Sequence, residues 1–167
     1  PIGLEDYKVL TSYRTLDALY DTERNKSAED IRNYQKQSYY DGQWKPAYEA
    51  MIQPALGWLK GPDYDRIAYN AAQTTAMLYT QPVVYEFKHL TMPVTFILGQ
   101  RDKTAPGRAW APEANKPLMG NYPLLGPKVV AMIPQGKLIK MPGLGHMPFV
   151  EDFEGFMPLF LKALSDK

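Results

Sequence analysis

Cysteine is absent from this chain of 167 residues, and histidine occurs only twice. The absence of cysteine excludes disulfide bonds and a thiol nucleophile, and it is compatible with both the cytoplasm and the periplasm. Histidine is the side chain best suited to proton transfer near neutral pH, so His89 and His146 are considered separately. His89 lies in a linker beside Lys88 and ahead of Pro93, and we interpret it as structural.

The chain also lacks an excess of charge of either sign. Nineteen Lys and Arg residues face eighteen Asp and Glu residues, which gives a formal charge of +1, and no Lys/Arg-rich run occurs. Without a strong positive field, neither nucleic acid nor an anionic membrane is an expected partner. No uninterrupted apolar stretch approaches the ~20 residues that a membrane-spanning helix needs. We also expect no metal ion and no cofactor.

Helical patterns fill the first 88 residues. Ser27 provides an N-cap followed by acidic residues, which predicts a helix to about Tyr40. A second helix is expected from Lys45 to Lys60. From Tyr64 onward apolar residues fall at helical spacing and predict the clearest amphipathic helix of the chain. Its apolar positions are Ile67, Ala68, Ala71, Ala72, Thr75, Leu78 and Tyr79.

Strand patterns are confined to the second half, where the apolar runs 94–99 and 137–141 each predict a strand. The first run leads to Asp102, and the second leads to His146. An Asp directly after a strand is most often a turn former, and a lone His is more often structural than catalytic. A catalytic interpretation of Asp102 and His146 is therefore supported only by their joint occurrence after two strands.

The remainder of the second half is less regular. Residues 83–87 are interpreted as a short alternating or loop segment, and five prolines in 105–127 predict a long wrapped loop. A short helix is expected from about Pro127 to Ile133. The last helix is expected from Asp152 to Leu164, with Phe153, Phe156, Phe160 and Leu164 on one face.

Two motifs resemble the closing segments of the α/β-hydrolase superfamily. They are Gly99-x-x-Asp102-x-x-x-Pro106 and Gly143-x-Gly145-His146-x-Pro148. Their order of strand, Asp, strand, His and final helix is also the order in that superfamily. The resemblance implies an α/β fold, namely the C-terminal portion of an α/β-hydrolase sheet with a helical cap. Residues 1–4 would end a core strand, 5–88 would form the cap, and 89–167 would form the C-terminal part of the core.

The nucleophile of that superfamily has no counterpart in the sequence. No Gly-x-Ser-x-Gly occurs in the 167 residues. Gly57 and Gly61 have the glycine spacing of a nucleophile elbow, but Leu59 occupies the nucleophile's place and no strand precedes it. The resemblance therefore implies that the early strands, the oxyanion loop and the elbow lie before Pro1. We expect this chain to occur with a missing N-terminal half or in a swapped oligomer.

The chemistry implied by the resemblance assigns a role to each residue. Asp102 would accept a hydrogen bond from His146 Nδ1–H across about 2.6–3.2 Å, and His146 Nε2 would take the proton of the nucleophile. The glycines beside His146 would allow a sharp turn. With a Ser nucleophile the reaction is cleavage of an ester or related acyl bond, and with an Asp nucleophile it is dehalogenation or epoxide opening. A non-catalytic hydrolase-like binding protein is the further alternative.

The expected cap is rich in aromatic residues with a polar end. They are Tyr34, Tyr39, Tyr40, Trp44, Tyr48, Trp58, Tyr64, Tyr69 and Tyr79. Such side chains either line an apolar pocket with hydroxyls for orientation or pack the helices against one another. The substrate expected from this composition is small and at least partly apolar.

Overall fold

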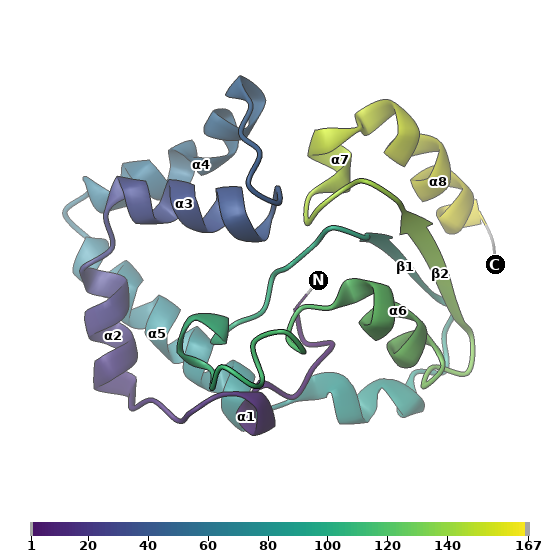
Figure 1. Cartoon of the computed structure of the whole chain (residues 1–167), viewed down its shortest axis with the longest axis horizontal. Helices are drawn as coiled ribbons and strands as arrows, with labels where there is room; N and C mark the ends of the chain where they lie inside the picture. The colour runs from purple at the N-terminus through teal and green to yellow at the C-terminus, as the bar shows by residue number, and fades with distance from the viewer. Residues whose placement is uncertain (1, 166–167) are drawn as a thin grey trace.

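The fold combines a group of helices with a small parallel sheet, as seen in a computed structural model that describes residues 2–165 (Figure 1). The first half contains α1 (Tyr7–Leu10), α2 (Leu16–Arg24), α3 (Ala28–Ser38), α4 (Pro46–Leu59), α5 (Tyr64–Thr80) and the 3₁₀ helix η1 (Val83–His89). The second half contains β1 (Val94–Gly99), the 3₁₀ helix η2 (Arg108–Trp110), α6 (Tyr122–Val130), β2 (Gly136–Met141), α7 (Pro148–Glu151) and α8 (Phe153–Ser165). The predicted α/β class is confirmed by this mixture of helices and parallel strands.

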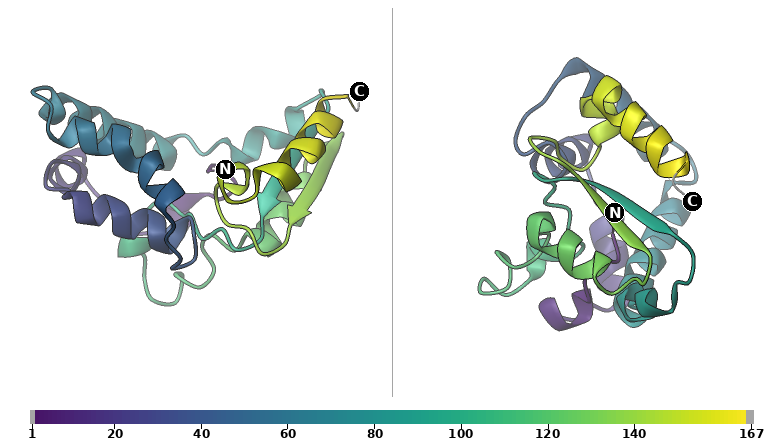
Figure 2. Two further views of the ribbon diagram at one scale, coloured as in Figure 1. Left: turned by 90° about the horizontal axis from the view of Figure 1, so that it is seen from above. Right: turned by 90° about the vertical axis from the view of Figure 1, so that its right-hand side faces the viewer.

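The two strands pair in parallel with a simple register. Val94 lies opposite Gly136, and Gly99 lies opposite Met141. Both strands therefore end at the same edge of the sheet, and the loops that follow them start side by side. α6 packs against both strands from one side, and α7 and α8 lie on the other side (Figures 1 and 2). Viewed from above, α2 to α5 form an arm beside this sheet layer, whereas η1 lies with the sheet (Figure 2).

The start of α3 shows why the helical half could be predicted. Ser27 Oγ accepts a hydrogen bond from the backbone N of Asp30 at 3.1 Å, and Asp30 Oδ2 accepts one from the backbone N of Ser27 at 2.8 Å. This reciprocal capping box satisfies two amide groups that the helix itself cannot pair. The predicted N-cap is confirmed, and α4 and α5 likewise match the ranges expected for them.

We expect Ser27→Ala to lower the free energy of unfolding by about 1 kcal/mol, because it removes the capping hydroxyl. Chemical denaturation of the full-length protein measures this change. Ser27→Thr retains a hydroxyl at the same position and should behave like the parent protein. Equal losses in both variants would mean that the capping hydrogen bonds contribute nothing.

Several expected boundaries are corrected by the structure. Residues 83–89 form the 3₁₀ helix η1 in place of an alternating or loop segment. The helix expected from Pro127 begins earlier, at Tyr122. Pro123 fits its first turn because backbone N–H groups there have no partner within the helix, so a residue without an N–H loses no hydrogen bond. The last helix, α8, matches its expected range to within one residue at each end, whereas the short helix α7 before it was not predicted. The short helices α1 and α2 were not predicted individually, although Thr15 caps α2 by accepting from the backbone N of Ala18.

One apolar core cluster lies between the sheet and α6, and a second is formed by Tyr7, Ala105, Ala111 and Met119. Leu98 of β1 is 2% exposed and packs in one cluster with Leu4, Tyr122, Val129 and Ile133. Glu5 is also buried, and its Oε2 accepts a hydrogen bond from the backbone N of Gly120 at 3.0 Å. The segment before α1 therefore packs beside β1 through Leu4 and is hydrogen-bonded through Glu5 to the loop between β1 and α6. Pro1 lies outside the described residues, and the assignment of 1–4 to the end of a core strand stays a prediction.

Part of the apolar surface of the sheet layer is not covered by the described residues. β1 pairs with β2 along one edge, and no other described strand pairs with it. In α8 none of the described residues is buried, and Phe153, Leu161 and Leu164 are 57%, 57% and 65% exposed. The amphipathic face predicted for this helix is formed, but the described chain does not bury it.

Candidate active site

The two residues singled out by the sequence meet at one edge of the sheet. Asp102 follows β1, and His146 follows β2, so each lies just beyond the carboxyl end of its strand. Asp102 Oδ2 lies 2.8 Å from His146 Nδ1. The Asp102 side chain is 3% exposed and the His146 side chain 16% exposed. The predicted Asp–His contact is confirmed in its distance and in the atoms that make it.

Asp102 also performs the turn-forming role that is common for an Asp after a strand. Its second oxygen, Oδ1, accepts a hydrogen bond from the backbone N of Thr104 at 2.8 Å. The carbonyl of Thr104 in turn accepts from the hydroxyl of Tyr122 at 3.0 Å. One carboxylate oxygen thus fixes the local turn, and the other is directed at the imidazole. Asp102 thus has a structural contact through Oδ1, and its Oδ2 makes the contact with His146 that the functional interpretation requires.

Glycine is needed near His146 because of close packing. A Cβ on Gly99 would collide with the carbonyl oxygens of Leu144 and Gly145, and a Cβ on Gly145 would collide with the carbonyl of Tyr39. Of these three glycines, only Gly143 has a positive φ, at 74°. Gly143 therefore provides the turn, and Gly145 allows the chain before His146 to approach the helical half. The expected sharp turn is present, with distinct roles for the two glycines.

The C-terminal end of α3 contacts both loops that carry the pair. The carbonyl of Ser38 accepts from the backbone N of Lys103 at 3.1 Å, and the carbonyl of Tyr39 accepts from the backbone N of His146 at 2.9 Å. The Tyr39 ring also lies against the imidazole, with centroids 4.2 Å apart and planes tilted by 39°. The sequence identified Tyr39 only as one of many aromatic residues, because no local pattern indicates which of them reaches His146.

The surroundings of Asp102 keep nearby phenols neutral. Burial raises the pKa of Tyr39, and the negative charge of Asp102 raises it further. The same two causes, again with burial the larger, raise the pKa of Tyr122. A neutral phenol can donate a hydrogen bond, as Tyr122 does to the carbonyl of Thr104.

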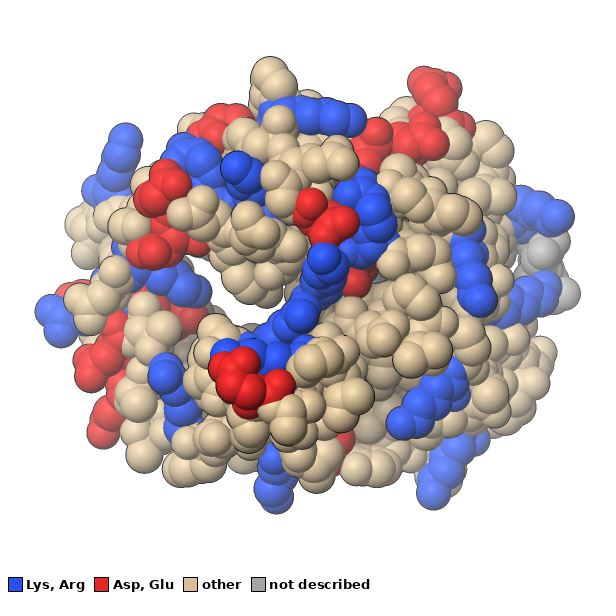
Figure 3. Space-filling view, in the orientation of Figure 1, with Lys and Arg blue, Asp and Glu red and all other residues tan. Residues whose placement is uncertain are grey.

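A groove opens beside the segments that hold the Asp–His pair, although neither Asp102 nor His146 lines it. It has a volume of about 1100 Å³ and lies between α2, α3 and α5 on one side and the loop after β1 on the other. Figure 3 shows the molecule hollowed in this region. Its apolar lining includes Ile31, Tyr34, Leu78, Pro106 and Trp110. Its charged lining includes both signs, namely Lys26, Lys103, Arg108 and Lys116 together with Glu23 and Asp30. Ser38 and Lys103 belong both to this lining and to the segments that hold Asp102 and His146.

Some aromatic residues of the helical half pack the helices against one another, and others line the groove. Tyr40 and Tyr48 are fully buried, and their rings stack with centroids 3.7 Å apart, so these two residues pack the helices. Tyr34 lines the groove. Trp110, which the sequence analysis did not identify, comes from η2 and lines the groove opposite the helices.

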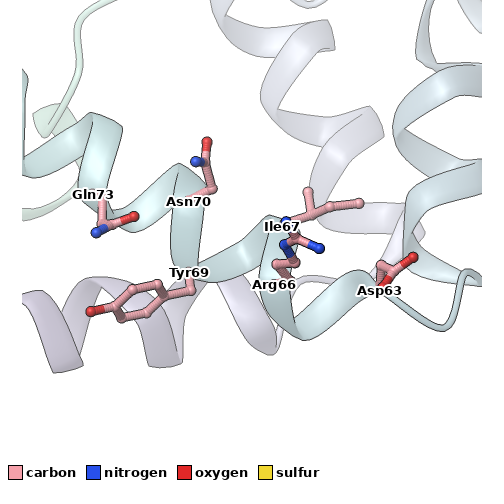
Figure 4. Close-up of a pocket in the computed structure, with 6 residues that line it drawn as sticks. All are labelled: Asp63, Arg66, Ile67, Tyr69, Asn70 and Gln73. Carbon is pink, nitrogen blue, oxygen red and sulfur yellow. The ribbon is translucent and has the colours of Figure 1, made fainter.

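Other candidate features lie elsewhere or are absent from residues 2–165. A second hollow of about 570 Å³ is formed by Asp63, Arg66, Ile67, Tyr69, Asn70 and Gln73 of α5 and its start, without either loop of the Asp–His pair (Figure 4). His89 is exposed at the end of η1. No group of three or more His, Asp or Glu side chains in the described residues is arranged to hold a metal ion. Within the same residues no helix is both long and apolar enough to cross a membrane.

Comparison with known proteins shows that this arrangement resembles a solved structure. No protein-family model matches the chain, and no curated protein sequence matches it. A crystal structure of a probable hydrolytic enzyme from Pseudomonas aeruginosa superimposes with a TM-score of 0.94 and 41% sequence identity. The match covers 98% of this chain and 53% of the Pseudomonas chain. The present chain therefore spans about half the length of the protein that it resembles, and it shares the fold of that half.

Proposed function

We propose that this chain is the C-terminal part of a serine-type α/β-hydrolase that cleaves an ester or related acyl bond. The observation that carries the proposal is the 2.8 Å contact between Asp102 Oδ2 and His146 Nδ1 at the carboxyl ends of two adjacent parallel strands. Similarity to a probable hydrolytic enzyme over 98% of the chain supports it. Within this function Asp102 is the triad acid and His146 is the general base.

The geometry supports a defined proton path. Asp102 accepts from Nδ1–H of His146, which places the basic lone pair on Nε2 and stabilises the imidazolium when it forms. No described residue is hydrogen-bonded to Nε2, so this nitrogen is available to a serine hydroxyl. His146 would take the serine proton during attack on the carbonyl, and would return a proton to the leaving group.

The nucleophile is proposed to come from an N-terminal half that completes the sheet. The second edge of β1 and the apolar face of α8 are uncovered in the described chain. Parallel sheets are stable only with several strands and with both faces covered. Leu4 belongs to the same core cluster as Leu98 of β1, which supports a core strand entering beside β1 just before α1. Strands, an oxyanion loop and a nucleophile elbow would fill the uncovered edge and face.

The substrate is proposed to be small and partly apolar. The groove beside the Asp–His pair offers Ile31, Tyr34 and Trp110 as apolar and aromatic lining. The helices of residues 5–88 would then act as the cap over this groove, with the C-terminal end of α3 in contact with the loops of Asp102 and His146.

We expect a fluorophosphonate probe to label the full-length protein covalently on a serine outside residues 1–167. Fluorophosphonates react with a serine that a neighbouring base activates, so labelling requires the complete triad. Intact mass and peptide mapping after labelling identify the modified residue. Labelling of the His146→Ala variant should be slower by orders of magnitude, because the base is lost.

The same experiment separates the alternatives. Labelling that is equally fast in the parent protein and in His146→Ala would contradict the assignment of the base. An unlabelled protein that opens epoxides or dehalogenates alkyl halides would establish an Asp nucleophile instead. A protein that neither reacts with the probe nor turns over any of these substrates would contradict the proposed enzyme and favour a binding protein.

A further inference from the structure

The backbone that carries His146 is glycine-rich, and two charged side chains bind it in addition to the carbonyl of Tyr39. Arg101 Nε donates to the carbonyl of Gly143 at 2.6 Å. Glu151 Oε1 accepts from the backbone N of Gly145 at 2.5 Å. Arg101 and Glu151 therefore hold the two glycines that precede His146, one through its carbonyl and the other through its amide.

Arg101 and Glu151 are also bonded to each other. Arg101 NH2 lies 3.0 Å from Glu151 Oε2, and the Glu151 side chain is only 4% exposed. Burial raises the pKa of Glu151, whereas the hydrogen bond from Gly145 and the charge of Arg101 act in the opposite direction. A buried carboxylate with both oxygens occupied has a fixed position, because moving it would leave a charge without partners.

Arg101 extends the same network to the Asp102 loop and to the helical half. Its backbone N donates to the carbonyl of Leu144 at 2.8 Å, and it directly precedes Asp102 in the chain. Its NH1 group lies 3.5 Å from the carbonyl of Tyr40 and 3.9 Å from Asp41 Oδ2. One guanidinium therefore connects the Asp102 loop, the His146 loop, α7 and the turn after α3.

We propose that Arg101 and Glu151 are positioning residues that keep His146 Nδ1 at Asp102 by fixing the backbone of Gly143 and Gly145. This inference rests on the proposed function. Neither side chain lies on the proton path, so their effect would pass through the geometry of His146. A glycine-rich loop without these contacts would let the imidazole leave Asp102, and misplacement by about 1 Å can cost on the order of 10²-fold in rate.

The test uses Glu151→Gln and Arg101→Lys in the full-length protein. The amide of the first cannot form the ion pair, and the ammonium of the second cannot reach Gly143 and Glu151 together. We expect kcat for para-nitrophenyl acetate to fall about tenfold to 100-fold in each variant, with KM changed less than threefold. Because both variants break one unit, the double variant should lose no more than the worse single variant.

A matched control exists in the helical half. Arg32 binds Glu49 through two hydrogen bonds, from Nε at 3.0 Å and from NH2 at 2.7 Å, and this pair links α3 to α4. Glu49→Gln breaks the same kind of ion pair without touching the His146 loop, and should leave kcat unchanged. The proton NMR resonance of His146 Nδ1–H provides a second readout. We expect it to broaden or disappear in Glu151→Gln and to persist in Glu49→Gln.

The possible outcomes are distinct. If Glu151→Gln and Arg101→Lys retain kcat and the Nδ1–H resonance while His146→Ala is inactive, the positioning role is wrong and the proposed function stands. If His146→Ala retains turnover, the proposed function itself is wrong. Equal losses in Glu49→Gln would mean that general destabilisation causes the effect, and would also overturn the positioning role. If Glu151→Gln fails to fold, Arg101→Lys alone decides, by the same criteria.

Discussion

Asp102→Asn in the full-length protein should lower kcat by about 10⁴-fold, by analogy with the same change in a serine protease triad. The carboxylate at 2.8 Å fixes which nitrogen of His146 carries the proton, and an amide at that position favours the wrong tautomer. A loss of this size corresponds to about 5.4 kcal/mol of transition-state stabilisation. His146→Ala should be at least as severe, because it removes the base itself. Steady-state hydrolysis of a short-chain aryl ester measures both effects.

The control for these variants is the second histidine. His89 is exposed at the end of η1 and belongs to neither loop of the Asp–His pair, so His89→Ala should retain the turnover of the parent protein. Thermal unfolding of each variant separates lost chemistry from lost folding. Near-normal turnover in a folded His146→Ala protein would reject the assignment.

Residues 1–167 expressed alone should show no esterase activity and should not remain monomeric. Among the described residues no nucleophile is hydrogen-bonded to His146 Nε2, so no hydroxyl is in place to give its proton to this nitrogen. The uncovered edge of β1 and the exposed apolar residues of α8 favour association with other chains. Ester assays together with light scattering test both parts of this prediction.

Co-expression with the N-terminal half provides the positive control. We expect that half to cover β1 and α8, to restore activity and to give one complex of defined mass. A well-behaved monomer of residues 1–167 that hydrolyses esters would require a nucleophile within the 167 residues. That result would contradict our proposal that the chain is part of a longer hydrolase.

The sequence alone was sufficient for features that depend on neighbouring residues. Ser27 and Asp30 cap α3 through contacts three residues apart, and the apolar runs 94–99 and 137–141 mark both strands. Asp102 and His146 were identified because each follows a strand within a short motif. Such signals lie within a few residues of one another, where spacing and residue type carry most of the structural information.

The tertiary structure decided which distant residues serve the pair. Arg101 and Glu151 are 50 positions apart, and Tyr39 is more than a hundred positions before His146, so no local pattern connects them. Arg101 lies within the first motif and Glu151 lies three residues after the second, but nothing in their spacing indicates that they bind each other. Periodicity shows which face of an element is apolar, whereas its partner depends on how the whole chain packs. For that reason the Asp–His pair could be predicted, while the residues that hold it in place required the fold.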